Sequence, residues 1–275
     1  MIADCTMPDP RILVFDSGLG GLTVFAPILA GRPDADLTYV ADDAFFPYGA
    51  LADRALIVRV VSLMEELVAT LRPDLVVIAC NTASTLVLAP LRERFPDLPF
   101  VGTVPAIKPA ALASRSKLIT VLATPGTVAR DYTRALIHEF AVDCEVTLVG
   151  SARLAGLAEQ ALRGEAVLDA DIAEEIAPGF VERGARRTDQ IVLACTHFPL
   201  LAERLAALSP WPVAFVDPAP AIARRVDALL GPAGPVRKAG ASPAIFTRGG
   251  EAPAALQKAL LRLGLTFSSP PTFAR

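Results

Sequence analysis

The fold is decided by LVVIAC at residues 75–80 and QIVLAC at residues 190–195. Each stretch is a short aliphatic run with the length and β-branched content typical of a buried strand. Each ends in a cysteine, Cys80 or Cys195, and a polar turn follows at once, NT in the first case and TH in the second. Buried strands that run into polar turns are typical of parallel βαβ units, so the chain is predicted to be an α/β protein.

Further strand candidates lie on both sides of these two stretches. They are RILVF (11–15), DLTYV (36–40), PFVG (99–102), LITVLAT (118–124), CEVTLVG (144–150) and PVAFVD (212–217). Amphipathic stretches such as DRALIVRVVSLMEELVATL (53–71) alternate with them. The alternation predicts doubly wound, parallel-rich sheets with helices on both faces.

An approximate internal repeat divides the chain. The turn DSGLGG after the first strand pairs with TPGT at residues 124–127, and CNTAS pairs with CTHFP. We therefore expect two similar α/β lobes related by a pseudo-twofold duplication, with both cysteines facing one cleft between them. Proline-containing segments at 101–111 and 216–225 are interpreted as crossings, so residues 1–104 plus 216–275 form the first lobe and 105–215 the second.

Composition excludes several classes of protein. The chain has 275 residues, of which 53% are hydrophobic and 20% charged, so it can bury the core of a two-domain enzyme. A net charge of −3 gives no basic footprint, so nucleic acid is not an expected partner. No apolar run is long enough to span a membrane, and residues 1–11 lack the features of a secretory signal, so a cytoplasmic location is expected.

The cysteines carry the chemistry in this interpretation. The chain has 4 cysteines and no CxxC pair, so neither a metal site nor a disulfide framework is expected. Cys80 and Cys195 each stand at a strand end beside a helix N-terminus, where backbone N–H groups and the helix dipole favour a thiolate and should lower the thiol pKa. Buried structural cysteines are the alternative, but matched placement in two related halves favours a catalytic pair.

The glycine-rich turn DSGLGG does not fit a dinucleotide site. It lacks the GxGxxG spacing, and Asp16 would repel a pyrophosphate. Asp16 is instead a candidate to bind a substrate ammonium or to orient a base, and Ser17 a candidate to meet a carboxylate; capping of the next helix is the alternative for both. Thr124 and Thr127 occupy the equivalent turn of the second half and offer donors for an anion.

The chain has 2 histidines with different prospects. His197 follows Cys195 by two positions and is a candidate to polarise that thiol. A Cys195–His197 hydrolase dyad is disfavoured, because residues two apart on such a turn seldom meet in the required orientation. His138 lies in RALIHEF, a helical surface pattern, and is interpreted as an ordinary solvated or packed residue.

Taken together, seven motifs resemble the glutamate racemases of the aspartate/glutamate racemase superfamily, from about residue 11 to residue 230. They are VFDSGLGGLTV, FPYGAL, VVIACNTAS, VGTVPAIKPAA, VLATPGTV, LACTHFPLL and DPAPAIARR. The resemblance implies two α/β lobes with the active site between them. It also implies proton transfer without pyridoxal phosphate or any other cofactor.

The resemblance further assigns residues to roles. Cys80 should act on D-glutamate and Cys195 on L-glutamate, with Asp16 and His197 assisting those thiols. The matching substrate-binding positions are Asp16, Ser17, Tyr48, Gly49, Asn81, Thr82, Thr124 and Thr196. Preorganised donors in a cleft that excludes water would stabilise the carbanion that forms when a weakly acidic α-proton leaves.

Two segments depart from the family pattern. Phe45 stands where the loop before PYG usually has an arginine. The stretch after Cys144, EVTLVGSARLAGLAE, lacks the usual proline-rich segment that ends in a glutamate assisting a catalytic cysteine. Glu159 is therefore not assigned as the substitute, and the auxiliary acid remains open.

The resemblance also implies a biological setting: supply of D-glutamate for peptidoglycan, hence cell-wall biogenesis and cell shape. A homodimer and an interaction with DNA gyrase are implied as partners beyond glutamate itself. Two rival functions remain open. One is a racemase or isomerase of the same superfamily that acts on aspartate or another small dicarboxylate, and the other is a non-catalytic protein that binds glutamate or regulates gyrase.

Overall fold

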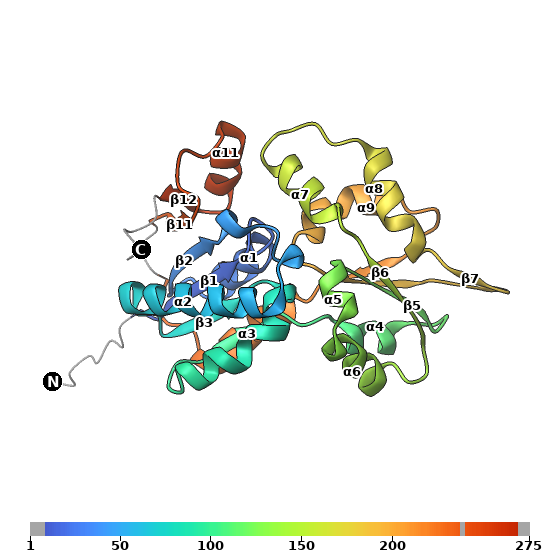
Figure 1. Ribbon diagram of the computed structural model, residues 1–275, viewed down its shortest axis with the longest axis horizontal. Coiled ribbons are helices and arrows are strands. Elements are labelled where there is room, and N and C mark those ends of the chain that lie inside the picture. The colour runs from blue at the N-terminus through green and yellow to red at the C-terminus, as the bar shows by residue number, and fades with distance from the viewer. Residues whose placement is uncertain (1–8, 237–239, 269–275) are drawn as a thin grey trace.

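The computed structural model describes residues 9–236 and 240–268, which form two lobes side by side (Figure 1). The first lobe is built on a parallel sheet with the strand order β12-β11-β2-β1-β3-β4. Its strands are β1 (Arg11–Asp16), β2 (Asp36–Ala41), β3 (Leu75–Ile78), β4 (Phe100–Gly102), β11 (Ser242–Phe246) and β12 (Leu265–Ser268). Its helices are α1 (Leu22–Gly31), α2 (Asp53–Leu71), α3 (Asn81–Arg94), α10 (Ala219–Leu230) and α11 (Ala254–Arg262), with short 3₁₀ turns η1 (Asp43–Phe45) and η2 (Tyr48–Ala50).

The second lobe is built on a smaller parallel sheet with the order β10-β9-β5-β6. Its strands are β5 (Leu118–Ala123), β6 (Glu145–Gly150), β9 (Gln190–Ala194) and β10 (Ala214–Val216), and a short antiparallel hairpin joins β7 (Glu182–Arg183) to β8 (Arg186–Arg187). Its helices are α4 (Ile107–Ala113), α5 (Pro125–Ala129), α6 (Asp131–Phe140), α7 (Leu154–Leu162), α8 (Asp169–Ile176) and α9 (Ala202–Ala207), with η3 (Ala177–Gly179) and η4 (Phe198–Leu201).

The repeat predicted from the sequence is confirmed by the topology. The run β2-β1-β3-β4 in the first sheet has the same order and direction as β6-β5-β9-β10 in the second. In this correspondence β3 matches β9, so Cys80 and Cys195 follow equivalent strands. The expected α/β class with two doubly wound lobes is therefore confirmed.

Every strand candidate named from the sequence forms a strand, but the hairpin strands β7 and β8 and the sheet strands β11 and β12 were not predicted. Strands β11 and β12 extend the first sheet beyond β2 with a chain segment that comes last in the described sequence (Figure 1). The crossings between sheets lie between β4 and α4 and between β10 and α10, and α10 packs on α1. The division at residues 104/105 and 215/216 stays our proposal for the lobe boundaries; the second boundary falls before Val216, the last residue of β10.

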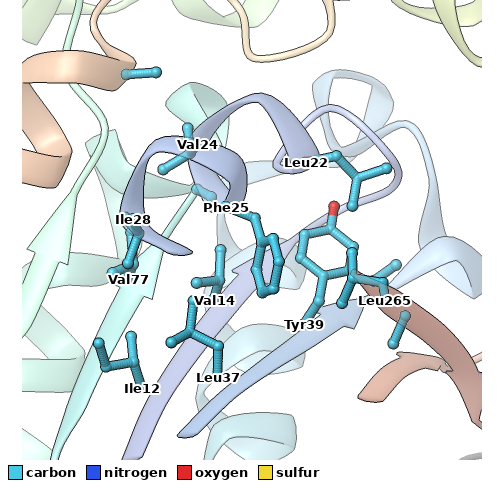
Figure 2. Packing of buried hydrophobic residues seen from close by; sticks show 14 of the residues in the cluster. Ile12, Val14, Leu22, Val24, Phe25, Ile28, Leu37, Tyr39, Val77 and Leu265 are labelled. Carbon is cyan, nitrogen blue, oxygen red and sulfur yellow. The ribbon is translucent and has the colours of Figure 1, made fainter. Parts of the chain in front are cut away.

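The first sheet is buried on both faces. Along β1, Ile12 and Val14 face the core formed with α1 and α10, while Leu13 and Phe15 face the core formed with α2 and α3. Alternation of side chains along a strand explains why consecutive apolar residues serve two cores. Figure 2 shows the first of these cores, where the Phe25 ring meets Tyr39 edge to face with ring centroids 6.0 Å apart.

The strand ends place the polar turns where the sequence analysis expected them. Helix α3 begins at Asn81, directly after Cys80, and α5 begins at Pro125, a residue favoured at the first helical position. The Thr124 side chain caps α5 by accepting a hydrogen bond from the Thr127 amide. The turns of both lobes therefore meet at the carboxyl ends of their sheets.

Within the described ranges, no helix has both the length and the apolar character needed to cross a bilayer.

We expect Phe25→Ala to lower the free energy of unfolding by about 3–5 kcal/mol, because Phe25 is fully buried and its removal leaves a cavity between α1 and the sheet. The measurement is urea denaturation followed by circular dichroism. Val58→Ala, at a side chain that is 61% exposed on α2, is the control and should change stability by less than about 0.5 kcal/mol. Equal effects of the two substitutions would contradict the described packing.

Candidate active site

A narrow cavity of about 20 Å³ lies between the lobes at the carboxyl ends of both sheets. Its walls come from both halves of the chain: Ser17, Phe46, Pro47, Tyr48, Gly49, Cys80, Asn81, Thr82, Thr124, Ala155, Cys195, Thr196 and His197. Both sequence-predicted catalytic cysteines and nearly all the predicted binding residues therefore meet at one place. Asp16, which ends β1, lies behind this wall and is fully buried.

Cys80 is a buried thiol at the N-cap of α3. Its Sγ lies 3.7 Å from the Ser17 hydroxyl. Burial raises the pKa of the Cys80 thiol and the Asp16 carboxylate raises it further, while the Ala83 amide and the Ser17 hydroxyl act in the opposite direction. The expectation that the helix N-terminus lowers this pKa is wrong for Cys80, because loss of solvation outweighs the donors around it.

Cys195 is the first member of a chain of contacts that also includes His197 and Glu159. Its Sγ lies 3.8 Å from His197 Nδ1, and His197 Nε2 lies 3.0 Å from Glu159 Oε1. Burial alone would lower the pKa of His197, but the contacts with Cys195 and Glu159 raise it well above its ordinary value. His197, which directly precedes η4, therefore contacts the thiol that the sequence analysis expected it to polarise.

Glu159, left unassigned by the sequence analysis, lies at the centre of the lobe contact. Its Oε1 also accepts a hydrogen bond from the Leu19 amide at 2.6 Å, and its Oε2 accepts one from Arg163 Nη2 at 3.1 Å. Burial raises the pKa of this carboxyl, but His197, the Leu19 amide and Arg163 together hold the pKa below its usual range. One signal was present in the sequence: an acidic residue on the apolar face of α7, beside Ala155 and Ala158.

The glycines of DSGLGG allow the second lobe to approach the first. A Cβ on Gly18 would lie 2.2 Å from Glu159 Oε1, and a Cβ on Gly20 would lie 2.3 Å from His197 Nδ1. The Gly20 amide lies 3.1 Å from His197 Nε2. The turn therefore serves close packing of backbone against a carboxylate and an imidazole, which explains why it lacks a phosphate-binding spacing.

Some buried polar atoms near the cavity have no hydrogen-bond partner within the described residues. Asp16 Oδ2 accepts the Gly21 amide at 2.8 Å. Within residues 9–236 and 240–268, the buried side-chain atoms without a hydrogen-bond partner are Asp16 Oδ1 and both amide atoms of Asn81. Burial raises the pKa of Asp16, although the charge of His197 opposes this shift. Unpaired buried polar groups are costly, and a bound ammonium and carboxylate would satisfy them.

Threonine hydroxyls from the two lobes meet at the cavity wall. Thr82 Oγ1 lies 3.1 Å from Thr124 Oγ1 and 3.3 Å from Thr127 Oγ1, and the last two are 3.0 Å apart. Thr196 is buried on the same cavity, and its carbonyl accepts the Thr23 hydroxyl at 3.0 Å. These hydroxyls can rotate to donate to a carboxylate that enters the cavity.

Tyr48 faces the cavity, but its hydroxyl points elsewhere. It donates to Asp42 Oδ2 at 2.6 Å, and Arg59 binds both oxygens of the same carboxylate at 2.9 and 2.7 Å. Thr247, just after β11, also donates to Asp42 at 2.7 Å. Because this network occupies the Tyr48 hydroxyl, the groups that Tyr48 and Gly49 can offer to a ligand in the cavity are those of their backbone.

Phe45, His138 and Cys144 do not line the cavity. Phe45, where an arginine was expected, lies 43% exposed with its ring under Arg59, and Phe46 packs instead against the His197 ring at 5.2 Å. His138 is exposed on α6, as predicted. Cys144 is a half-buried thiol outside the cavity wall.

Comparison with known proteins agrees with this geometry. The family model for Asp/Glu/hydantoin racemases matches residues 26–226. A glutamate racemase of Brucella anthropi is 56% identical over 230 residues, which cover 84% of this chain and 82% of the relative. The Escherichia coli glutamate racemase, solved in complex with L-glutamate and the activator UDP-MurNAc-Ala, matches with a TM-score of 0.86 and 40% identity, covering 95% of this chain and 98% of that one.

A more distant structure supports the same relationship. A glutamate racemase isoform of Bacillus anthracis matches with a TM-score of 0.79 and 25% identity, covering 96% of this chain and 98% of that one. The family model spans most of the chain, and the Brucella protein shares more than half of the aligned residues. The chain belongs to the glutamate racemases, isomerases within the Asp/Glu/hydantoin racemase family.

Proposed function

We propose that this protein interconverts L- and D-glutamate by proton transfer between two cysteines, without pyridoxal phosphate. The observation that carries the proposal is that Cys80 and Cys195, which follow equivalent strands of two similar lobes, line the same cavity. Two groups of the same kind on opposite faces of one carbon suit a reaction that runs in both directions.

The proton moves between sulfur and carbon in two steps. The Cys80 thiolate removes the α-proton of D-glutamate and becomes a thiol, leaving the electron pair on the α-carbon. The Cys195 thiol then donates its proton to the other face, which gives L-glutamate and a Cys195 thiolate. The reverse direction begins from that state, so no external acid or base is consumed.

The two thiolates are stabilised by different neighbours. For Cys195, the positively charged form of His197 is stabilised by Glu159 and pairs with the sulfur. For Cys80, the α-ammonium of glutamate supplies the positive charge, because a cation close to a buried thiol lowers its pKa. Asp16, with one oxygen unpaired, is the group we assign to bind or exchange a proton with that ammonium.

The carboxylates of glutamate are assigned to the donors on the cavity wall. They are Ser17, the backbone of Tyr48 and Gly49, Asn81, Thr82, Thr124 and Thr196. Donors fixed in a dry cavity stabilise the developing negative charge without the cost of reorganising solvent. The complex of the Escherichia coli relative with L-glutamate supports this choice of substrate.

The biological role that follows is supply of D-glutamate for peptidoglycan in the cytoplasm. Homodimer formation and an interaction with DNA gyrase remain predictions from the family resemblance.

The proposed reaction is tested by incubating the purified protein with L-glutamate in D2O, without added pyridoxal phosphate or metal. We expect loss of optical activity together with loss of the α-proton NMR signal, and the same with D-glutamate. Parallel incubation with L-aspartate distinguishes the substrate. Reaction of aspartate alone would reassign the substrate, and retention of the α-proton in both amino acids would favour a binding protein.

We expect Cys80→Ala and Cys195→Ala each to reduce racemisation in both directions by at least about a hundredfold, because each removes one of the two acid/base groups. Polarimetry with each enantiomer measures the effect. Cys144→Ala is the matched control, a half-buried thiol away from the cavity, and should keep its rate within about twofold. Near-normal racemisation by either active-site variant would rule out the two-thiol mechanism.

Glu159→Gln is expected to move the alkaline limb of the kcat/KM profile to lower pH by about one unit. The Glu159 carboxylate raises the pKa of His197, so its loss lets the imidazolium deprotonate at lower pH. Polarimetric rates from pH 6 to pH 10 test this, with Glu174→Gln on α8 as a control that lies in an exposed ion pair. An unshifted alkaline limb would show that His197 does not act as the charged partner of Cys195.

A further inference from the structure

The active-site cavity between the lobes is narrow. At about 20 Å³ it holds roughly one water molecule and is far too small for glutamate. Entry and release therefore require the lobes to part. The contacts that join the lobes around the cavity decide how easily this happens.

One group of these contacts includes the catalytic side chains. The Leu19 and Gly20 amides of the first lobe meet Glu159 and His197 of the second, and the Thr23 hydroxyl donates to the Thr196 carbonyl. Parting of the lobes would remove the Leu19 hydrogen bond from Glu159. Closure therefore completes the chain of contacts that reaches Cys195.

The other group is formed by Arg130, at the junction of α5 and α6 in the second lobe. Its Nη1 donates to the Thr82 carbonyl at 2.8 Å and to the Thr85 hydroxyl at 2.6 Å, both on α3 of the first lobe. Its Nη2 donates to Asp53 at the start of α2, at 2.8 Å. One guanidinium thus ties the second lobe to two helices of the first.

Burial indicates which of these bonds matter most. The Arg130 side chain is 12% exposed, whereas Asp53 is 63% exposed, so the ion pair is screened by solvent and contributes little. The bonds to Thr82 and Thr85 are more protected. A surface hollow of about 470 Å³, lined by Gly49, Thr85 and Gly126 among others, lies over Arg130, so water can replace these bonds when the lobes part.

The position of Arg130 links this tie to the site. Thr82 accepts from Arg130 through its carbonyl, while its hydroxyl meets Thr124 across the cavity wall. Thr82 also follows Cys80 and Asn81 in the first turn of α3. Arg130 therefore holds the helix start that carries one catalytic thiol against the turn of the opposite lobe.

We propose that Arg130 is a positioning residue that latches the second lobe onto α3 and keeps the glutamate site closed. The latch itself is a property of the fold, and its kinetic consequence rests on the proposed racemase function. Loss of the latch shifts the lobes toward the open arrangement, which weakens substrate retention and exposes the contacts on the far side of the cavity.

Amide hydrogen exchange of Arg130→Gln tests the latch without turnover. We expect the Leu19 and Gly20 amides to exchange at least about tenfold faster, while the β1 amides stay protected and the melting temperature is unchanged. A local structural defect at Arg130 would not reach these amides, which lie across the site in the other group of contacts. Wild-type exchange at Leu19 and Gly20 would overturn the proposal.

Steady-state kinetics of the same variant supply the second readout. The KM for both glutamate enantiomers should rise severalfold, with a smaller fall in kcat, and Arg130→Lys should restore part of the loss. Arg134→Gln, an exposed arginine on α6, is the matched control. If KM and kcat keep their wild-type values, the latch has no role in substrate retention and the proposal fails.

A double variant, Asp53→Ala with Thr85→Val, guards against misfolding of the Arg130 variant, because it removes both side-chain acceptors of Arg130 and leaves the arginine in place. Faster exchange at Leu19 and Gly20 supports the latch, and unchanged exchange overturns it. If the wild-type protein fails to racemise glutamate while the exchange results hold, the proposed function fails and the latch stands.

Discussion

The hydrogen bond from the Leu19 amide to the buried Glu159 carboxylate is the interaction on which the arrangement of the site depends. It joins the first lobe to the second, and the same Glu159 carboxylate contacts His197, which in turn contacts Cys195. The carboxylate remains ionised in a buried setting because an amide, an imidazole and a guanidinium surround it. Gly18 and Gly20 leave the space that this contact requires, so the sequence of the turn is dictated by a partner about 140 residues away.

Much of the fold was accessible from local patterns in the sequence. Apolar runs such as 75–80 and 190–195 predicted strands because strands buried on both faces must be apolar throughout. The repeat then predicted that the two lobes are similar, and the shared strand order agrees with this. Strand β11 was not predicted because its sequence, SPAIF, is short and contains a proline, so that only its pairing with β2 makes it a strand. Strand β12 in turn pairs with β11.

The cavity brings together residues that the sequence analysis chose by residue type. Features of the site that depend on burial or on distant contacts were not visible in the sequence. Cys80, Cys195 and His197 stand beside strand ends, which a sequence displays directly. The raised pKa of Cys80 could not be seen, because it results from burial of the thiol and from the nearby Asp16 carboxylate. The hydrogen-bond network around the Tyr48 hydroxyl joins Asp42, Arg59 and Thr247 from separate parts of the chain. No local sequence pattern predicts contacts of this kind.

The shared strand order of the lobes has a consequence for the symmetry of catalysis. L- and D-glutamate have equal free energies, so kcat/KM must be the same in both directions whatever the residues around each sulfur. The two thiols follow equivalent strands but have unlike neighbours, a carboxylate near Cys80 and an imidazole in contact with Glu159 beside Cys195. The two enantiomers therefore share one specificity constant, while the separate values of kcat and KM are free to differ and record how far the duplicated halves have diverged.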